Sequence, residues 1–112
     1  MALMVDQGDE MVWSLVMFDL PVKTKPQQRE ATFFRNLLLD LGYEMVQYSV
    51  YVRYLPLPSL GSPAIQKIKR SLPADGLVRI INISDRAWSS AFRFSNEVPQ
   101  EAESRPGELT IF

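Results

Sequence analysis

Residues 44–54 read EMVQYSVYVRY, and their side chains alternate with the period of a β-strand. One face would carry Val46, Tyr48, Val50, Val52 and Tyr54, and the other would carry Met45, Gln47, Ser49, Tyr51 and Arg53. The pattern fits one long strand, and it fits equally well two short strands with a bend near residues 47–49. The number of strands formed here determines the topology of the whole chain.

The residues before this stretch predict a strand followed by a helix. Residues 13–20 (WSLVMFDL) are mostly apolar and are ended by Pro21, which predicts a central strand covered on both faces. Thr24 and Gln27 have the spacing of a capping box, and the apolar spacing that follows predicts a helix over 25–41. Its buried stripe would contain Ala31, Phe34, Leu38 and Leu41, broadened by Phe33 and Leu37.

The residues after this stretch predict a second helix and a further strand. The Ser-Pro pair at 62–63 starts a helix that Pro73 ends. Residues 77–83 (LVRIINI) then predict another buried strand. A helical turn is expected over 84–88, and a small strand over 91–94.

With two strands inside residues 44–54, the element order is that of an α+β ferredoxin-like fold, β-α-β-β-α-β. We assign residues 12–94 to this domain, residues 1–11 to a polar leader and residues 95–112 to a C-terminal tail. The tail ends in Glu108–Phe112, whose composition is strand-like. Such a strand needs a sheet edge, either in its own fold or in a second copy. This fold supports many functions and does not identify one.

The composition narrows the chemistry that the chain can perform. It has 112 residues, which is room for one domain, and it contains no cysteine and no histidine. Disulfides, catalytic relays through histidine and zinc sites made of these residues are therefore excluded. A metal would bind oxygen ligands, which favours magnesium. The apolar runs are too short to cross a membrane, and the acidic N-terminal segment is unlike a signal peptide. We therefore expect a cytoplasmic protein.

The net charge of −1 conceals an uneven distribution. Residues 1–22 carry four acids and no base, and residues 94–112 carry four acids and one base. Residues 23–93 carry eleven bases against five acids, a local charge of +6. A basic middle region is typical of nucleic-acid binding, although the solvated surface of an unrelated enzyme can look the same.

Asp19, at the end of the first predicted strand, is the most informative residue. A carboxylate at the end of an apolar strand costs free energy of desolvation unless a cation or hydrogen bonds compensate it. One interpretation is a magnesium ligand, and the alternative is an acid that caps backbone amides or pairs with Lys23 or Lys25. Catalytic sites for phosphoryl transfer usually need several carboxylates. A homodimer would bring Asp19 and its copy together across a two-fold axis.

Four bases, Lys23, Lys25, Arg29 and Arg35, follow Asp19 on a loop and on the exposed side of the first predicted helix. Bases around a helix N-terminus suit phosphate groups, and the alternative is a solvated helix face.

Gln47 and Ser49 interrupt an otherwise apolar strand. They form either a dimer seam or nucleotide contact, or a solvated strand face. The neighbouring tyrosines, Tyr48, Tyr51 and Tyr54, are expected to pack in the core or in an interface.

Several short motifs, in their order and spacing, resemble the CRISPR-associated endonuclease family Cas2, the small partner of the CRISPR integrase. These motifs are VMFDLP (16–21), FRNLL (34–38), GY (42–43), QYSVY (47–51), PADGLVR (73–79) and ELTIF (108–112). The resemblance covers residues 12–112 and is greatest to the branch encoded beside Cas9 effectors.

The resemblance implies a homodimer in which the C-terminal strand, with Leu109 and Ile111, pairs with the partner subunit's sheet. It implies that Asp19 is the catalytic residue and the Mg²⁺ ligand, and that the four bases after it contact a phosphate backbone. Family members are metal-dependent endonucleases on single-stranded RNA or on DNA. They also hold the double-stranded DNA protospacer and bridge the CRISPR integrase during spacer acquisition.

The chain departs from the family pattern in one place. Many relatives have a further acid a few residues after the strand-end aspartate, and here residues 22–24 are Val-Lys-Thr. A different class of function is a ferredoxin-like regulatory module that binds a small molecule. That alternative has no Gly-rich phosphate loop in its favour and leaves the basic middle region unexplained.

Overall fold

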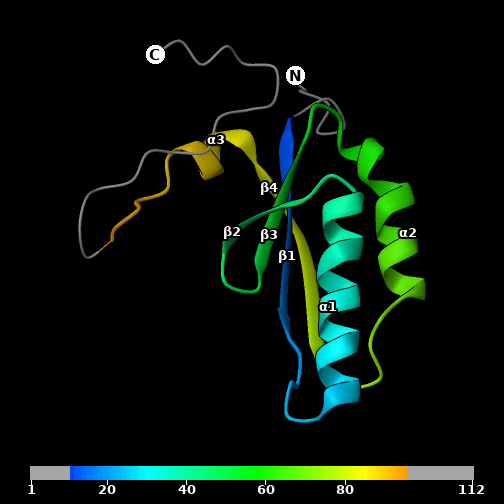
Figure 1. Ribbon diagram of the computed structural model, residues 1–112. Helices are drawn as coiled ribbons and strands as arrows, with labels where there is room; N and C mark the ends of the chain where they lie inside the picture. The colour runs from blue at the N-terminus through cyan, green and yellow to red at the C-terminus, as the bar shows by residue number, and fades with distance from the viewer. Residues whose placement is uncertain (1–10, 96–112) are drawn as a thin grey trace.

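The computed structural model describes residues 11–95 and confirms the α+β ferredoxin-like arrangement (Figure 1). The elements in order are β1 (Val12–Asp19), α1 (Lys25–Asp40), β2 (Glu44–Gln47), β3 (Val50–Leu55), a 3₁₀ turn η2 (Pro58–Gly61), α2 (Ser62–Arg70), β4 (Leu77–Ser84) and α3 (Asp85–Ser89). The strands form one antiparallel sheet in the order β2-β3-β1-β4. The helices α1 and α2 lie side by side on one face of it (Figure 1). The leader up to residue 10 and the tail from residue 96, with its predicted strand at 108–112, lie outside the described residues.

Residues 44–55 form two strands, β2 and β3, joined by a tight turn at residues 48–49. Ser49 occupies the left-handed backbone region with φ 63°, which reverses the chain. The backbone carbonyl of Ser49 accepts a hydrogen bond from the Phe18 amide at 3.1 Å. The hairpin turn is therefore fastened to the end of β1, which continuous alternation in the sequence did not reveal.

The predicted capping box starts α1. The Gln27 amide donates to Thr24 Oγ1 at 3.2 Å, and the Thr24 amide donates to Gln27 Oε1 at 3.1 Å. Ala31, Phe34 and Leu38 are buried as expected. The buried stripe is narrower than predicted, because Phe33 is 65% exposed. Its side chain points away from the one sheet that the helix covers.

Strand β1 is central and buried on both faces, as predicted. On the helix side, Val16 and Phe18 pack with core residues of α1 and α2. On the other side, Trp13 and Leu15 pack with Val52 of β3. The sheet is therefore a rigid support for whatever residue ends β1.

The prediction of a buried strand over 77–83 is wrong in one respect. The strand forms as β4, but it is an outer strand, with Leu77 58% and Ile81 41% exposed. It pairs with β1 along one edge, and its other edge has no strand partner among residues 11–95. Its apolar composition is typical of a buried strand and equally of a surface that a partner covers.

The small strand predicted over 91–94 does not form, whereas the helical turn expected before it is α3. The Arg93 guanidinium lies over the Trp88 ring, 5.4 Å from its centroid, and donates to the carbonyls of Trp88 and Ala91. These local contacts fold the segment back on α3, so it does not extend beside the sheet. None of the helices within 11–95 is long and apolar enough to cross a membrane.

Candidate metal and nucleic-acid site

Asp19 is the last residue of β1, and its carboxylate is exposed to solvent. It lies opposite Leu77 of β4 in the strand register. Two hollows meet at this residue. The β4 hollow, about 200 Å³, is lined by Met17, Phe18, Asp19, Leu77 and Arg79. The strand-end hollow, about 230 Å³, is lined by Phe18, Asp19, Leu20, Val22, Ala31, Arg35, Tyr48 and Ser49. Asp19 is therefore reachable from both sides of the strand end.

Two turns fix the backbone at Asp19. The Ser49 carbonyl holds the preceding residue, Phe18, as described above. On the other side Gly76, with φ 104°, lies so close that a Cβ there would sit 2.6 Å from the Asp19 carbonyl oxygen. Only glycine allows this approach and this backbone angle. The position of the carboxylate thus depends on contacts far apart in the sequence.

The Asp19 carboxylate forms no ion pair and no side-chain hydrogen bond with any residue from 11 to 95. The alternative in which it pairs with Lys23 or Lys25 is therefore not what the structure contains. An exposed, unpaired carboxylate retains its oxygen atoms for an external cation or donor.

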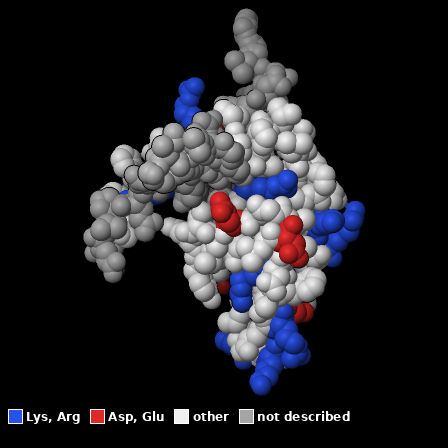
Figure 2. All heavy atoms as spheres, turned by 45° about the horizontal axis from the view of Figure 1, so that its top comes forward, with Lys and Arg blue, Asp and Glu red and all other residues white. Residues whose placement is uncertain are grey.

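The four predicted bases do not form one cluster. Arg35 is half-buried and lines the strand-end hollow with Asp19. Lys25 and Arg29 are exposed and line a separate hollow on the outer surface of α1. Lys23 lines none of these hollows, and its backbone amide donates to Gln27 Oε1 at 3.0 Å. Figure 2 likewise shows the basic side chains in several separate groups over the visible face, with few acids among them.

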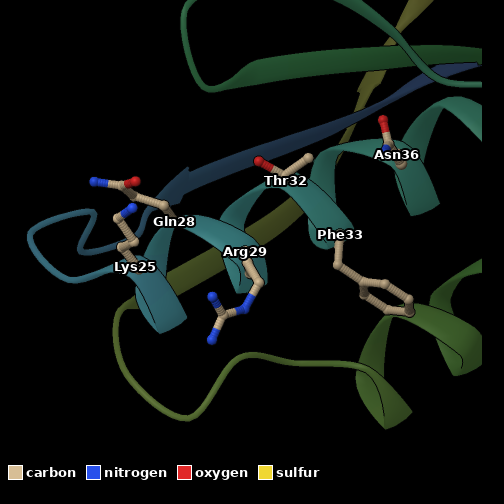
Figure 3. A pocket seen from close by; sticks show the side chains of 6 residues that line it. All are labelled: Lys25, Gln28, Arg29, Thr32, Phe33 and Asn36. Atoms are coloured by element: carbon tan, nitrogen blue, oxygen red, sulfur yellow. The ribbon is translucent and has the colours of Figure 1, made fainter.

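The hollow on α1 is the largest of the three, at about 480 Å³, and we call it the α1 hollow. Its lining is Lys25, Gln28, Arg29, Thr32, Phe33 and Asn36 (Figure 3). Lys25 and Arg29 make no ion pair within the described part of the chain. Their positive charge is therefore available to an external anion.

Gln47 and Ser49 have different surroundings. Gln47 is exposed at the end of β2, and Ser49 lines the strand-end hollow. Tyr48 between them is 83% exposed, so it is not in the core. Tyr51 is buried in the core, and Tyr54 packs against Trp13 with ring centroids 5.3 Å apart. Tyr51 and Tyr54 thus pack as predicted, and for Tyr48 the predicted alternative of an interface remains a prediction. Leu109 and Ile111 lie outside the described residues.

Arg79 is a site residue that sequence reasoning did not select. It shares the β4 hollow with Asp19, and its strand partner in the register is Met17. The available signal was a cation inside an apolar strand. Arg79 and Arg35 together place one cation in each hollow beside Asp19.

A single protomer offers few metal ligands. Among residues 11–95 there is no group of three or more acidic, histidine or cysteine side chains that could hold a metal ion. Asp19 therefore belongs to no such group among these residues. A complete oxygen-ligand site would need atoms from elsewhere, such as a second copy of the chain, water or a bound phosphate.

Comparison with known proteins gives a consistent result. The family model described as CRISPR associated protein Cas2 matches residues 11–91. A CRISPR-associated endoribonuclease Cas2 of Paracidovorax avenae is 37% identical over 105 residues, covering 94% of this chain and 97% of the relative. Another of the same name, from Campylobacter jejuni, is 41% identical over 105 residues, covering 93% and 73%. A solved structure described as a crystal structure of Cas2 covers 90% of this chain at 20% identity, with a TM-score of 0.52, and supports the fold.

Proposed function

This chain belongs to the CRISPR-associated protein Cas2 family, and from that premise we propose that it is a dimeric adaptation protein of the cytoplasm. In this proposal it holds double-stranded protospacer DNA and bridges the CRISPR integrase during spacer acquisition. It would also be a magnesium-dependent endonuclease, acting on single-stranded RNA or on DNA through Asp19. Its relatives are named endoribonucleases, which supports the hydrolytic part.

The observation that carries the DNA-binding proposal is the uncompensated charge on α1. Lys25 and Arg29 are exposed, one helical turn apart, and make no ion pair within residues 11–95. Phosphate contacts from such bases supply affinity without reading sequence. They release condensed counterions, so the binding weakens steeply with salt.

Exposed apolar residues on the sheet support a dimer. Leu77 and Ile81 lie opposite Asp19 and Leu15 in the strand register, on the face away from α1 and α2. The outer edge of β4 has no strand partner in the described part of the chain. A second copy would cover this apolar surface and the free edge. It would also add a second Asp19 to the lone carboxylate of each protomer.

The chemistry of Asp19 fits a magnesium ion. Its oxygens are hard ligands, exposed and not engaged in an ion pair with residues 11–95. Asp19 of each protomer would hold the ion, with water and phosphate oxygens completing the ligand set. When bound, the ion supplies an activated water and neutralises charge on the phosphate. The chain itself contributes Arg35 and Arg79, which would orient a phosphate group from the two hollows beside Asp19.

The test of the DNA-binding proposal is the salt dependence of affinity for a short labelled duplex. The double variant Lys25→Ala/Arg29→Ala should bind more weakly and lower the slope of log K against log salt by about 2, since each phosphate contact contributes about 0.9. The matched control is Arg86→Ala, which removes an exposed base from α3. An unchanged slope in the double variant would remove the α1 bases from the interface, and an equal loss in the control would contradict a site specific to α1.

A further inference from the structure

We propose that the α1 hollow is a binding site for an unpaired nucleotide, with Phe33 stacking on the base and Arg29 and Lys25 contacting the adjoining phosphates. The proposal rests on the proposed function in one respect, because it assumes that the chain binds nucleic acid. It adds a site, distinct from Asp19, that recognises single-stranded segments by the faces of their bases.

Phe33, unlike the phenylalanine next to it, is not part of the buried core. The adjacent Phe34 is fully buried and makes the aromatic contact with Phe18, with ring centroids 5.2 Å apart. Phe33 is 65% exposed, on the side of the helix away from the core. A single exposed apolar residue is ordinary on protein surfaces, so its neighbours decide the interpretation.

Its neighbours are cationic and polar. Arg29 precedes Phe33 by one helical turn, a rise of about 6 Å, and both side chains extend from the same side of α1 (Figure 3). Lys25 lies one turn further toward the helix N-terminus and lines the same hollow. An aromatic ring in one hollow with two cations that have no ion-pair partner among residues 11–95 is the combination that single-strand-binding proteins use for bases and backbone.

The polar side chains of the hollow divide into two kinds. Gln28 Nε2 donates to the Val22 carbonyl at 3.1 Å, and the Thr32 hydroxyl accepts from Arg35 Nη2 at 3.5 Å. Those two side chains already have structural hydrogen bonds. Asn36 has none within the described residues, so its amide can donate to and accept from a base edge.

The exposed ring favours a single strand over a duplex. Inside a duplex both faces of each base are covered by neighbouring base pairs, so away from the ends a protein reaches only edges and phosphates. Lys25 and Arg29 would contact the phosphates of either form of nucleic acid, whereas Phe33 would find no exposed base face inside a duplex. Removing the Phe33 ring should therefore weaken the binding of single-stranded nucleic acid and leave the binding of a duplex unchanged.

The experiment compares a single-stranded oligothymidylate with a duplex of equal length, binding to the full chain. Phe33→Ala should weaken single-strand binding by about 5- to 150-fold, the range expected for one lost stacking contact, and leave duplex binding unchanged. Phe33→Trp should retain single-strand affinity, with an added tryptophan emission that the oligonucleotide quenches. The control Leu39→Ala removes another exposed apolar side chain of α1, 51% exposed and outside the hollow, and should change neither affinity.

Other outcomes overturn the proposal. If the wild type binds both oligonucleotides and Phe33→Ala changes neither, the stacking site is wrong while the DNA-binding proposal stands. If Phe33→Ala instead weakens association with the purified integrase, the ring is a protein contact and the stacking site is again wrong. If the wild type binds neither oligonucleotide, both proposals fail.

Discussion

Replacing Gly76 with alanine adds a methyl group against the backbone that carries Asp19. The added Cβ would lie 2.6 Å from the Asp19 carbonyl oxygen and 2.8 Å from Leu20 Cδ2, so the turn or the strand end must move. The backbone angle, φ 104°, is one that side-chain-bearing residues rarely adopt. That angle costs about 1–3 kcal/mol, and overpacking adds about 1–3 kcal/mol. We expect Gly76→Ala to lower the free energy of unfolding by about 2–6 kcal/mol.

Gly42 provides the matched control for this variant. Its φ is 91°, so alanine there has a comparable backbone cost, but the added Cβ would meet only the Arg53 side chain at 3.5 Å. Gly42→Ala should therefore lower the free energy of unfolding only by the cost of the backbone angle, about 1–3 kcal/mol. Urea unfolding followed by far-ultraviolet circular dichroism measures both. If both variants lost the same free energy of unfolding, the close approach to Asp19 would not be the reason for a glycine at position 76.

Three further changes test the account at other places. Asp19→Asn should abolish magnesium-dependent cleavage of single-stranded RNA while leaving the dimer intact; cleavage that persists at the wild-type rate would place the chemistry elsewhere. Ile81→Glu puts a charge on the exposed sheet face and should convert the proposed dimer to monomer in sedimentation experiments; an unchanged sedimentation coefficient would exclude this face as the dimer contact. Tyr43→Phe leaves the buried Ser14 hydroxyl without its 2.7 Å partner and should cost about 1–3 kcal/mol in urea unfolding. A loss below the error of the measurement would show that the pair contributes little.

Local signals in the sequence were sufficient for most of the fold. Thr24 and Gln27 form the capping box that their spacing predicted, and the helix they start differs from the predicted one only in its last residue. The alternation across residues 44–54 could not show where the chain reverses, because a strand and a hairpin share the same period. The reversal depends on the backbone angle of Ser49 and on its bond to Phe18, which is a long-range contact.

The misjudged elements share a physical cause. The spacing of apolar residues indicates which side chains would gain free energy by leaving water. It does not indicate whether another part of the fold, a partner or nothing covers them. β4 has the composition of a buried strand and lies at the sheet edge, and Phe33 continues a helical apolar stripe yet faces solvent. Both positions depend on how many layers pack around the element, which is a property of the whole fold.

The candidate site was only partly predictable for a related reason. Asp19 stands out in the sequence because a carboxylate interrupts an apolar strand. Arg79 is sixty residues further on, and only the register between β1 and β4 brings it into the same hollow. Helical spacing puts Arg35 on a different side of α1 from Lys25 and Arg29, but which side adjoins Asp19 depends on how the helix packs on the sheet.

The central claim is that this chain holds DNA for an integrase, and spacer integration in vitro tests it most directly. The assay combines the cognate integrase, magnesium and a short duplex, with no added chain, wild type, Asp19→Ala or Lys25→Ala/Arg29→Ala. We predict that wild type and Asp19→Ala stimulate integration equally, because the scaffold role needs phosphate contacts and not the carboxylate. The double variant should stimulate it far less. Full stimulation by the double variant, or none by wild type over the integrase alone, would contradict the account.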